Sequence, residues 1–253
     1  MIKQFYKDDL LVKVFDTRDE MGRAAALYIA EKISALLLEK QEINMIFAAA
    51  LSQNELYSHL ILDKSIPWQS INAFHMDEYI GLPAGAKQAF SHYLEKKLFQ
   101  YCPFKSINLI DPYAKNPADE CERYEALLKK FPPDIVCMGI GENGHIAFND
   151  PPVADFHDEK LVKIVELEHS CRQQQVNDGA FENMEDVPEY AMTLTIPALI
   201  NAAVISCVVP GQTKAKAVYN TLNNAISTAC PATILRQTPT AVLFLDAESA
   251  AQL

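Results

Sequence analysis

The 253-residue chain lacks the marks of several specialised protein classes. Its six cysteines form no Cys-x-x-Cys pair and several lie in apolar, strand-like runs, so we expect buried thiols in a reducing cytoplasm rather than a disulfide framework or a zinc site. No apolar run approaches the ~20 residues needed to cross a bilayer, and the first residues carry no apolar signal region. We therefore expect a cytoplasmic protein without a membrane partner.

Basic residues are also scarce. Lysine and arginine number 22 against 33 aspartates and glutamates, which gives a formal net charge of −11 at pH 7. A protein this acidic has no basic stripe to neutralise the phosphates of a nucleic acid, so we expect no nucleic-acid partner. It can still bind a small anionic metabolite, but only at a locally positive site.

What the chain does have is a regular alternation of strand and helix patterns. Apolar runs at 43–50, 134–138 and 204–209 indicate strands that are buried on both faces. Helical patterns lie between such runs, as at 21–39 and 117–131. This alternation predicts an α/β fold with an open, mostly parallel, Rossmann-like sheet and helices on both faces.

The length and the 49% hydrophobic content fit one large domain or two small ones. Because no linker or internal repeat is evident, we predict a single domain over residues 1–253. Residues 150–190 show the least regular pattern and are polar and acidic, which favours a lid or an insertion there. The sequence leaves open whether the chain acts alone or as a homo-oligomer.

Glycine is scarce, yet three of the eight glycines fall within six positions. Gly139, Gly141 and Gly144 come directly after the predicted strand that ends at residue 138. Glycine at this density lets the backbone turn tightly and approach a ligand. Open α/β sheets bind their ligands where strands end, so we predict that these glycines border a binding site.

The same turn carries His145, with Asn143 before it and Asp150 after it. A lone histidine is more often structural than catalytic. A nearby carboxylate, however, fixes the imidazole tautomer and raises its pKa, which suits acid–base catalysis. We predict that role for His145, with Asp150 as its partner.

Asp77 and Glu78 follow another predicted strand, at 71–75. Side chains alternate across a strand end, so we expect one of the two to face the ligand crevice and the other to point away. The alternative is a solvated acidic turn, which is common at such positions.

Two further turns are candidate anion sites. Gly211 opens a helix in which Lys214 adds a full positive charge, although the spacing is not that of a nucleotide P-loop. Ser52 follows the strand at 43–50, and its hydroxyl is suited to holding a phosphate. The alternatives are an ordinary surface lysine and a simple helix N-cap.

Taken together, these segments resemble the glucosamine-6-phosphate deaminase/isomerase family, whose fold is shared with the 6-phosphogluconolactonases. The matching segments are 76–82, 139–151, 187–193 and 211–215. The most specific parts are Met-Asp-Glu-Tyr at 76–79 and Gly-His-Ile-Ala-Phe-Asn at 144–149. The likeness spans nearly the whole chain in the same order. The residues after the shared Gly-His favour the amino-sugar branch over the lactonase branch.

The resemblance implies a phosphosugar substrate and chemistry that requires neither a metal nor a cofactor. An aspartate matching Asp77 would move a proton between C2 and C1 of the open-chain sugar. A histidine matching His145 would assist ring opening. A lysine matching Lys214 and a hydroxyl matching Ser52 would bind the phosphate.

The chain also departs from the family pattern. The family's ring-opening aspartate falls on Asn143, which cannot ionise, and its second carboxylate, usually glutamate, is Asp150. The usually glycine-rich phosphate loop reads Ala-Ala-Ala-Leu-Ser at 48–52. An ungapped register places Asn177 where a phosphate-binding arginine would stand, and we take the nearby Arg172 as its substitute.

Two other functions compete with amino-sugar isomerisation and deamination. A lactonase would use His145 to activate water and would not need Asp77 as a base. A sugar-phosphate sensor would keep the pocket and lose the chemistry, as Asn143 suggests. The strongly acidic chain without a basic helix-turn-helix argues against a transcriptional sensor.

Overall fold

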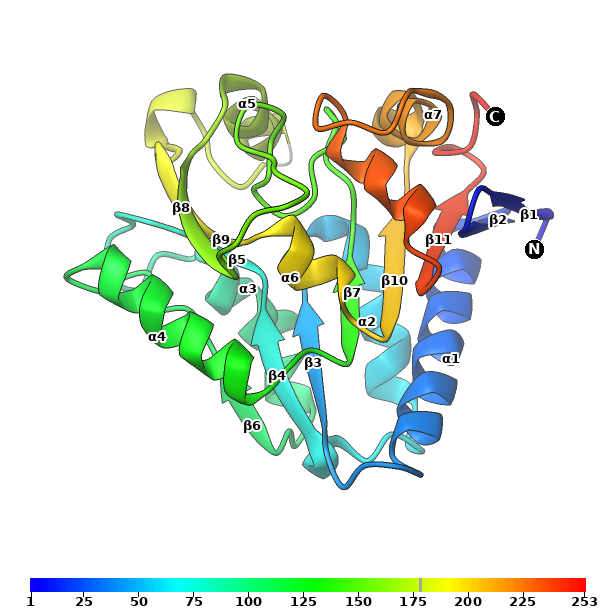
Figure 1. The fold of residues 1–253 in the computed structure, drawn as a ribbon, viewed down its shortest axis with the longest axis horizontal. Helices are drawn as coiled ribbons and strands as arrows, with labels where there is room; N and C mark the ends of the chain where they lie inside the picture. Colours follow the sequence, from blue (N-terminus) through cyan, green and yellow to red (C-terminus); the bar gives the residue numbers. More distant parts are fainter. Residues whose placement is uncertain (178) are drawn as a thin grey trace.

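The computed structural model describes residues 1–177 and 179–253. Its main sheet has eight strands in the order β1-β2-β11-β10-β7-β3-β4-β6 (Figure 1). All neighbouring pairs are parallel except the N-terminal β1–β2 hairpin, so the predicted mostly parallel sheet is confirmed. The strands are β1 (Lys3–Lys7), β2 (Leu10–Phe15), β3 (Ile43–Phe47), β4 (Ile71–His75), β6 (Ser106–Asn108), β7 (Ile135–Met138), β10 (Val204–Val209) and β11 (Ala241–Asp246).

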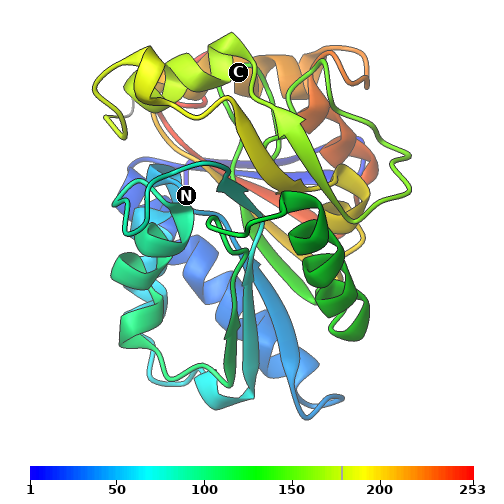
Figure 2. The same ribbon diagram turned by 90° about the vertical axis from the view of Figure 1, so that its left-hand side faces the viewer.

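Helices cover both faces of this sheet, as the apolar strands predicted. In β7, Val136 and Met138 pack into one hydrophobic cluster, whereas Ile135 and Cys137 pack into the other. Figure 2 shows the blue-to-teal helices on one side of the sheet and the green, yellow and orange ones on the other. The first group is α1 (Arg18–Leu36), α2 (Asn54–Leu62) and α3 (Phe90–Lys97); the second is α4 (Pro117–Lys130), α6 (Ile196–Ile200) and α7 (Ala215–Asn223).

A small antiparallel sheet lies beside the carboxyl ends of the main strands (Figure 1). Its order is β5 (Asp77–Tyr79), β9 (Tyr190–Leu194) and β8 (Val162–Glu166). Together with α5 (His169–Asn177), it gives residues 150–190 more regular structure than their composition indicated. The sequence pattern did not indicate β9 or α5.

The strand order places a topological switch between β3 and β7. The chain runs outward through β3, β4 and β6, returns to β7, and then runs outward in the other direction through β10 and β11. Ligands of open α/β sheets bind at such switch points, beyond the carboxyl ends of the strands. No helix in the described ranges is long and apolar enough to span a membrane.

Candidate active site

A cavity of about 510 Å³ lies at the carboxyl ends of β3, β4, β7 and β10. Its lining comes from segments far apart in the sequence, since each strand contributes the residues that follow it. Six of the residues predicted from the sequence line it: Ser52, Asp77, Gly139, Gly141, His145 and Lys214. The parallel sheet therefore brings most of the candidate residues to one place.

Asp77 and Glu78 point in different directions, as strand alternation predicted. The Asp77 side chain lines the cavity. The carboxylate of Glu78 instead accepts hydrogen bonds from the backbone amides of Phe90, at 2.9 Å, and Ser91, at 2.8 Å, at the start of α3. Burial raises the pKa of Asp77 well above its usual value, and the nearby charge of Glu78 adds to the shift. Such a carboxyl group is suited to exchanging protons near neutral pH.

His145 follows β7 and lines the same cavity, where it pairs with Asp150. Its Nδ1 is 2.9 Å from Asp150 Oδ1, and both residues are buried. The ring lies over Gly141, where a Cβ atom would be only 2.1–2.4 Å from three of the ring atoms. Only glycine at position 141 leaves room for the imidazole ring of His145.

Asn143 contacts the same oxygen of Asp150 as His145 does. Its Nδ2 donates to Asp150 Oδ1 at 2.8 Å and to Glu168 Oε2 at 3.1 Å, while its Oδ1 accepts from the backbone amide of His145 at 3.0 Å. Burial alone would raise the pKa of Asp150, but contacts with His145, Asn143 and Cys171 outweigh it and hold that pKa below its usual value. Asp150 is therefore an ionised partner for the imidazole.

Glu168 was not anticipated from the sequence. It lies 25 residues from Asn143 along the chain, just before α5, and no local motif connects the two. Only the folding of α5 back over the glycine turn brings them together. Gln174 and Gln175 of α5, which also line the cavity, were missed for the same reason.

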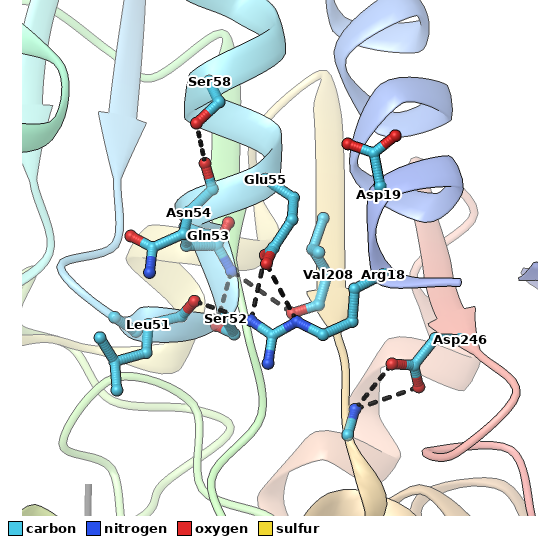
Figure 3. Close-up of polar contacts among 12 residues, drawn as sticks. Arg18, Asp19, Leu51, Ser52, Gln53, Asn54, Glu55, Ser58, Val208 and Asp246 are labelled. Carbon is cyan, nitrogen blue, oxygen red and sulfur yellow. Dashed lines mark hydrogen bonds and ion pairs between the residues drawn. The ribbon is translucent and has the colours of Figure 1, made fainter.

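Ser52 lines the cavity after β3, and the neighbouring Gln53 holds its side chain in place (Figure 3). Gln53 is completely buried, and its Nε2 donates to Ser52 Oγ at 2.9 Å and to Met138 O at 3.1 Å. The Ser52 oxygen accepts this bond, which leaves its hydroxyl hydrogen available to a ligand. Gly139 makes room here, because a Cβ on it would meet Ser52 Oγ at 3.0 Å.

The cavity is also locally positive, although the protein is acidic. Lys87 and Lys214 lie among its described lining residues, together with Arg18, whose charge is largely offset by its ion pair with Glu55. Asp77 is the one carboxylate among those same residues, and its raised pKa reduces its negative charge. This is the local site that an anionic metabolite requires on such a protein.

Two of the predicted substrate-binding residues lie outside the lining. Arg172 Nη2 donates to the carbonyls of Met184 and Val187, both at 2.9 Å, and so holds the segment after α5. Gly144 packs against Cys230, and its φ of +88° favours glycine. The side chain of Asn177 is exposed and accepts a hydrogen bond from Gln173.

One group of side chains has the donor types of a metal site. His145, Asp150 and Cys171 each offer an atom within 4.8 Å of the others. A thiol must lose its proton to ligate a metal. Burial, and then the charge of Asp150, raise the pKa of Cys171 well above its usual value. In this structure the Cys171 thiol is therefore a protonated neighbour of Asp150.

These features place a buried carboxyl, a carboxylate-paired imidazole and lysine side chains around one cavity of a doubly wound α/β fold. A family model for glucosamine-6-phosphate isomerases/6-phosphogluconolactonase matches residues 16–244. The chain belongs to this family.

Individual relatives agree with the family assignment. A glucosamine-6-phosphate deaminase of Bacillus thuringiensis is 33% identical over 238 residues, which cover 94% of this chain and 87% of that protein. The structure of a monomeric glucosamine-6-phosphate deaminase superimposes with a TM-score of 0.86 at 28% identity, covering 96% of this chain and 99% of its own. A 6-phosphogluconolactonase from Thermotoga maritima, at 20% identity and a TM-score of 0.76, covers 94% of this chain and 99% of its own and shares the fold.

Proposed function

We propose that the protein isomerises and deaminates glucosamine 6-phosphate, or a close relative, to give fructose 6-phosphate and ammonia. The observation that carries the proposal is the shared cavity of Asp77 and the His145–Asp150 pair, with Lys214 and Ser52 among its lining. A buried carboxyl and a paired imidazole supply two acid–base groups for one bound sugar. The cations supply attraction for its phosphate.

The chemistry begins with ring opening. His145, oriented by Asp150, takes the proton of the C1 hydroxyl while the ring oxygen gains a proton, which releases the open-chain aldehyde. In its ionised form Asp77 then removes the proton from C2 and delivers it to C1, while the C1 oxygen gains the proton that the C2 amine loses. The resulting C2 imine reacts with water, which gives the ketone and releases ammonia.

The proposal also assigns a role to residues 150–190. We propose that they form a cover rather than a separate domain, since Gln174 and Gln175 come from this region and line the cavity. The six free cysteines fit activity in the cytoplasm.

The test measures ammonia and ketose-phosphate release from glucosamine 6-phosphate and from galactosamine 6-phosphate. We expect release from one of these sugars and a loss of about 10²–10⁴-fold in kcat for Asp77→Asn. Hydrolysis of 6-phosphogluconolactone that survives Asp77→Asn would instead establish a lactonase. Saturable binding of these sugars without turnover would establish a sensor.

A further inference from the structure

Arg18 is the one arginine among the described residues that line the cavity. It is the first residue of α1, far in sequence from the region where the family's phosphate-binding arginine is expected. Neither Arg172 nor Asn177 reaches the lining. A guanidinium therefore enters this cavity from α1, on the side of the Ser52 turn (Figure 3).

The guanidinium is held in a fixed orientation. Its Nε is 3.1 Å from Glu55 Oε1 and its Nη2 is 3.0 Å from Glu55 Oε2, a two-point contact between planar groups. Nη2 also donates to Leu51 O at 3.2 Å. The helices approach closely at this point, because a Cβ on Gly22 would lie 2.5 Å from Glu55 Cβ. Two helices and the turn before Ser52 thus fix one side chain.

The third guanidinium nitrogen, Nη1, does not take part in these contacts. No hydrogen bond among the described residues uses Arg18 Nη1. Figure 3 shows this nitrogen pointing away from Glu55 and from Leu51. A guanidinium whose other nitrogens are occupied presents Nη1 as an aimed donor. Phosphate oxygens are ligands that such donors bind well.

We propose that Arg18 binds the phosphate of the substrate together with Ser52 and Lys214. This inference rests on the proposed function. It assigns the arginine contact with the phosphate to α1, whereas the resemblance placed that contact in α5. Glu55 neutralises much of the charge of Arg18, so the contribution is a directed hydrogen bond rather than a long-range field. The less glycine-rich turn at 48–52 fits the same arrangement, since Leu51 O is one of the groups that fix Arg18.

The competing explanation is a purely structural ion pair between α1 and α2. Arg123 of α4 provides a matched control, because its Nε and Nη2 contact Glu120 and its Nη2 donates to Leu109 O in the same pattern. Its side chain is 47% exposed, against 41% for Arg18, and it does not line the cavity. Replacing each arginine by methionine removes one two-point arginine–glutamate ion pair, and Glu120, the partner of Arg123, is the more buried of the two glutamates.

The experiment compares Arg18→Met, Arg18→Lys and Arg123→Met. We expect Arg18→Met to raise KM for the sugar phosphate, and Ki for inorganic phosphate, by about tenfold or more, with kcat nearly unchanged. Arg18→Lys should fall between it and the wild type, and Arg123→Met should change neither constant. Equal losses of thermal stability with KM and Ki unchanged in Arg18→Met would overturn the proposal.

The result remains decisive if the proposed function fails. Should the wild type turn over no amino-sugar phosphate, calorimetric titration with inorganic phosphate replaces the kinetic assay. About tenfold weaker binding by Arg18→Met than by Arg123→Met would still assign Arg18 to the phosphate. Equal binding by the two variants, or no binding by the wild type, would overturn it.

Discussion

The amide nitrogen of Asn143 lies 2.8 Å from Asp150 Oδ1, at the position where the family resemblance implies an aspartate. The same nitrogen lies 3.1 Å from Glu168 Oε2. Its two hydrogens therefore satisfy two carboxylates at once. Asparagine at this position is matched to Glu168, and the departure from the family pattern has a local cause.

Asn143→Asp should harm the protein although it restores the family residue. The new carboxylate would meet Asp150 and Glu168 where the amide donated hydrogen bonds. Leaving such buried groups unpaired costs about 1–3 kcal/mol. We expect lower thermal stability and lower kcat/KM at neutral pH, measured by thermal unfolding and by ammonia release.

The double variant Asn143→Asp, Glu168→Gln tests the coupling. The second substitution would return a donor amide from the opposite side, so both stability and kcat/KM should recover. We expect a coupling free energy of about 1 kcal/mol or more from the mutant cycle. Effects that simply add would separate Glu168 from the site.

The pH dependence of kcat/KM should report Asp77. As the base it must be ionised, so activity falls as the pH drops through its pKa. Because burial and then Glu78 raise that pKa, the acid limb should lie well above about pH 3.9, the value of an ordinary aspartate. Initial rates over a pH series measure it.

Glu78→Gln isolates the second cause of this shift. The amide keeps one oxygen, for either the Phe90 or the Ser91 backbone amide, and removes the charge beside Asp77. We expect the acid limb to move to lower pH without leaving the elevated range, since burial is the larger cause. An acid limb near pH 4 in the wild type would assign it to another group.

Much of this arrangement follows from the sequence. The apolar runs predicted the parallel strands, and parallel strands bring their carboxyl ends to one edge, so Ser52, Asp77, His145 and Lys214 meet as expected. What the sequence did not predict depends on tertiary contacts. Arg18, for example, reaches the cavity through its contact with Glu55, 37 residues away.

The short strand β9 and helix α5 illustrate the same limit. Helix α5 has little amphipathic character, with Cys171 and Gln174 as its buried residues. It contacts the glycine turn through Ser170, which accepts from Asn143, and through Gln174, which accepts from the Glu142 backbone amide, so its position depends on polar contacts rather than on a hydrophobic pattern. Periodicity cannot detect such a helix.

Two glycine substitutions should separate catalysis from binding. Gly141→Ala places a Cβ within 2.4 Å of the His145 ring, which must move away from Asp150. We expect kcat to fall about 10²-fold, the cost of a displacement of about 1 Å at a catalytic group. Gly139→Ala instead crowds Ser52 Oγ at 3.0 Å, and so should mainly raise KM. Steady-state kinetics on both variants distinguishes these effects, and equal changes in both constants would contradict the assignment.

His75 should make the fold sensitive to acid. It is completely buried on β4, and its Nε2 accepts a hydrogen bond from the backbone amide of Ile110 at 2.7 Å, so the folded protein holds the neutral ring. Burial lowers the pKa of His75 from 6.5 to about 3. Above pH 6.5 the ring is neutral in both the folded and unfolded states. Below it, only the unfolded chain takes up a proton, so the contribution to stability is lost as the pH falls.

Between pH 7 and pH 5 we expect His75 to lower the free energy of unfolding by about 2 kcal/mol. The reason is that one extra proton bound by the unfolded chain changes this free energy by about 1.4 kcal/mol per pH unit. Urea unfolding at the two pH values measures it. His75→Gln keeps an acceptor for the Ile110 amide but cannot titrate, so its stability should fall less over this range. The exposed His157 provides the control, and His157→Gln should keep the wild-type dependence. The same pH dependence in all three proteins would show that another group causes the acid sensitivity.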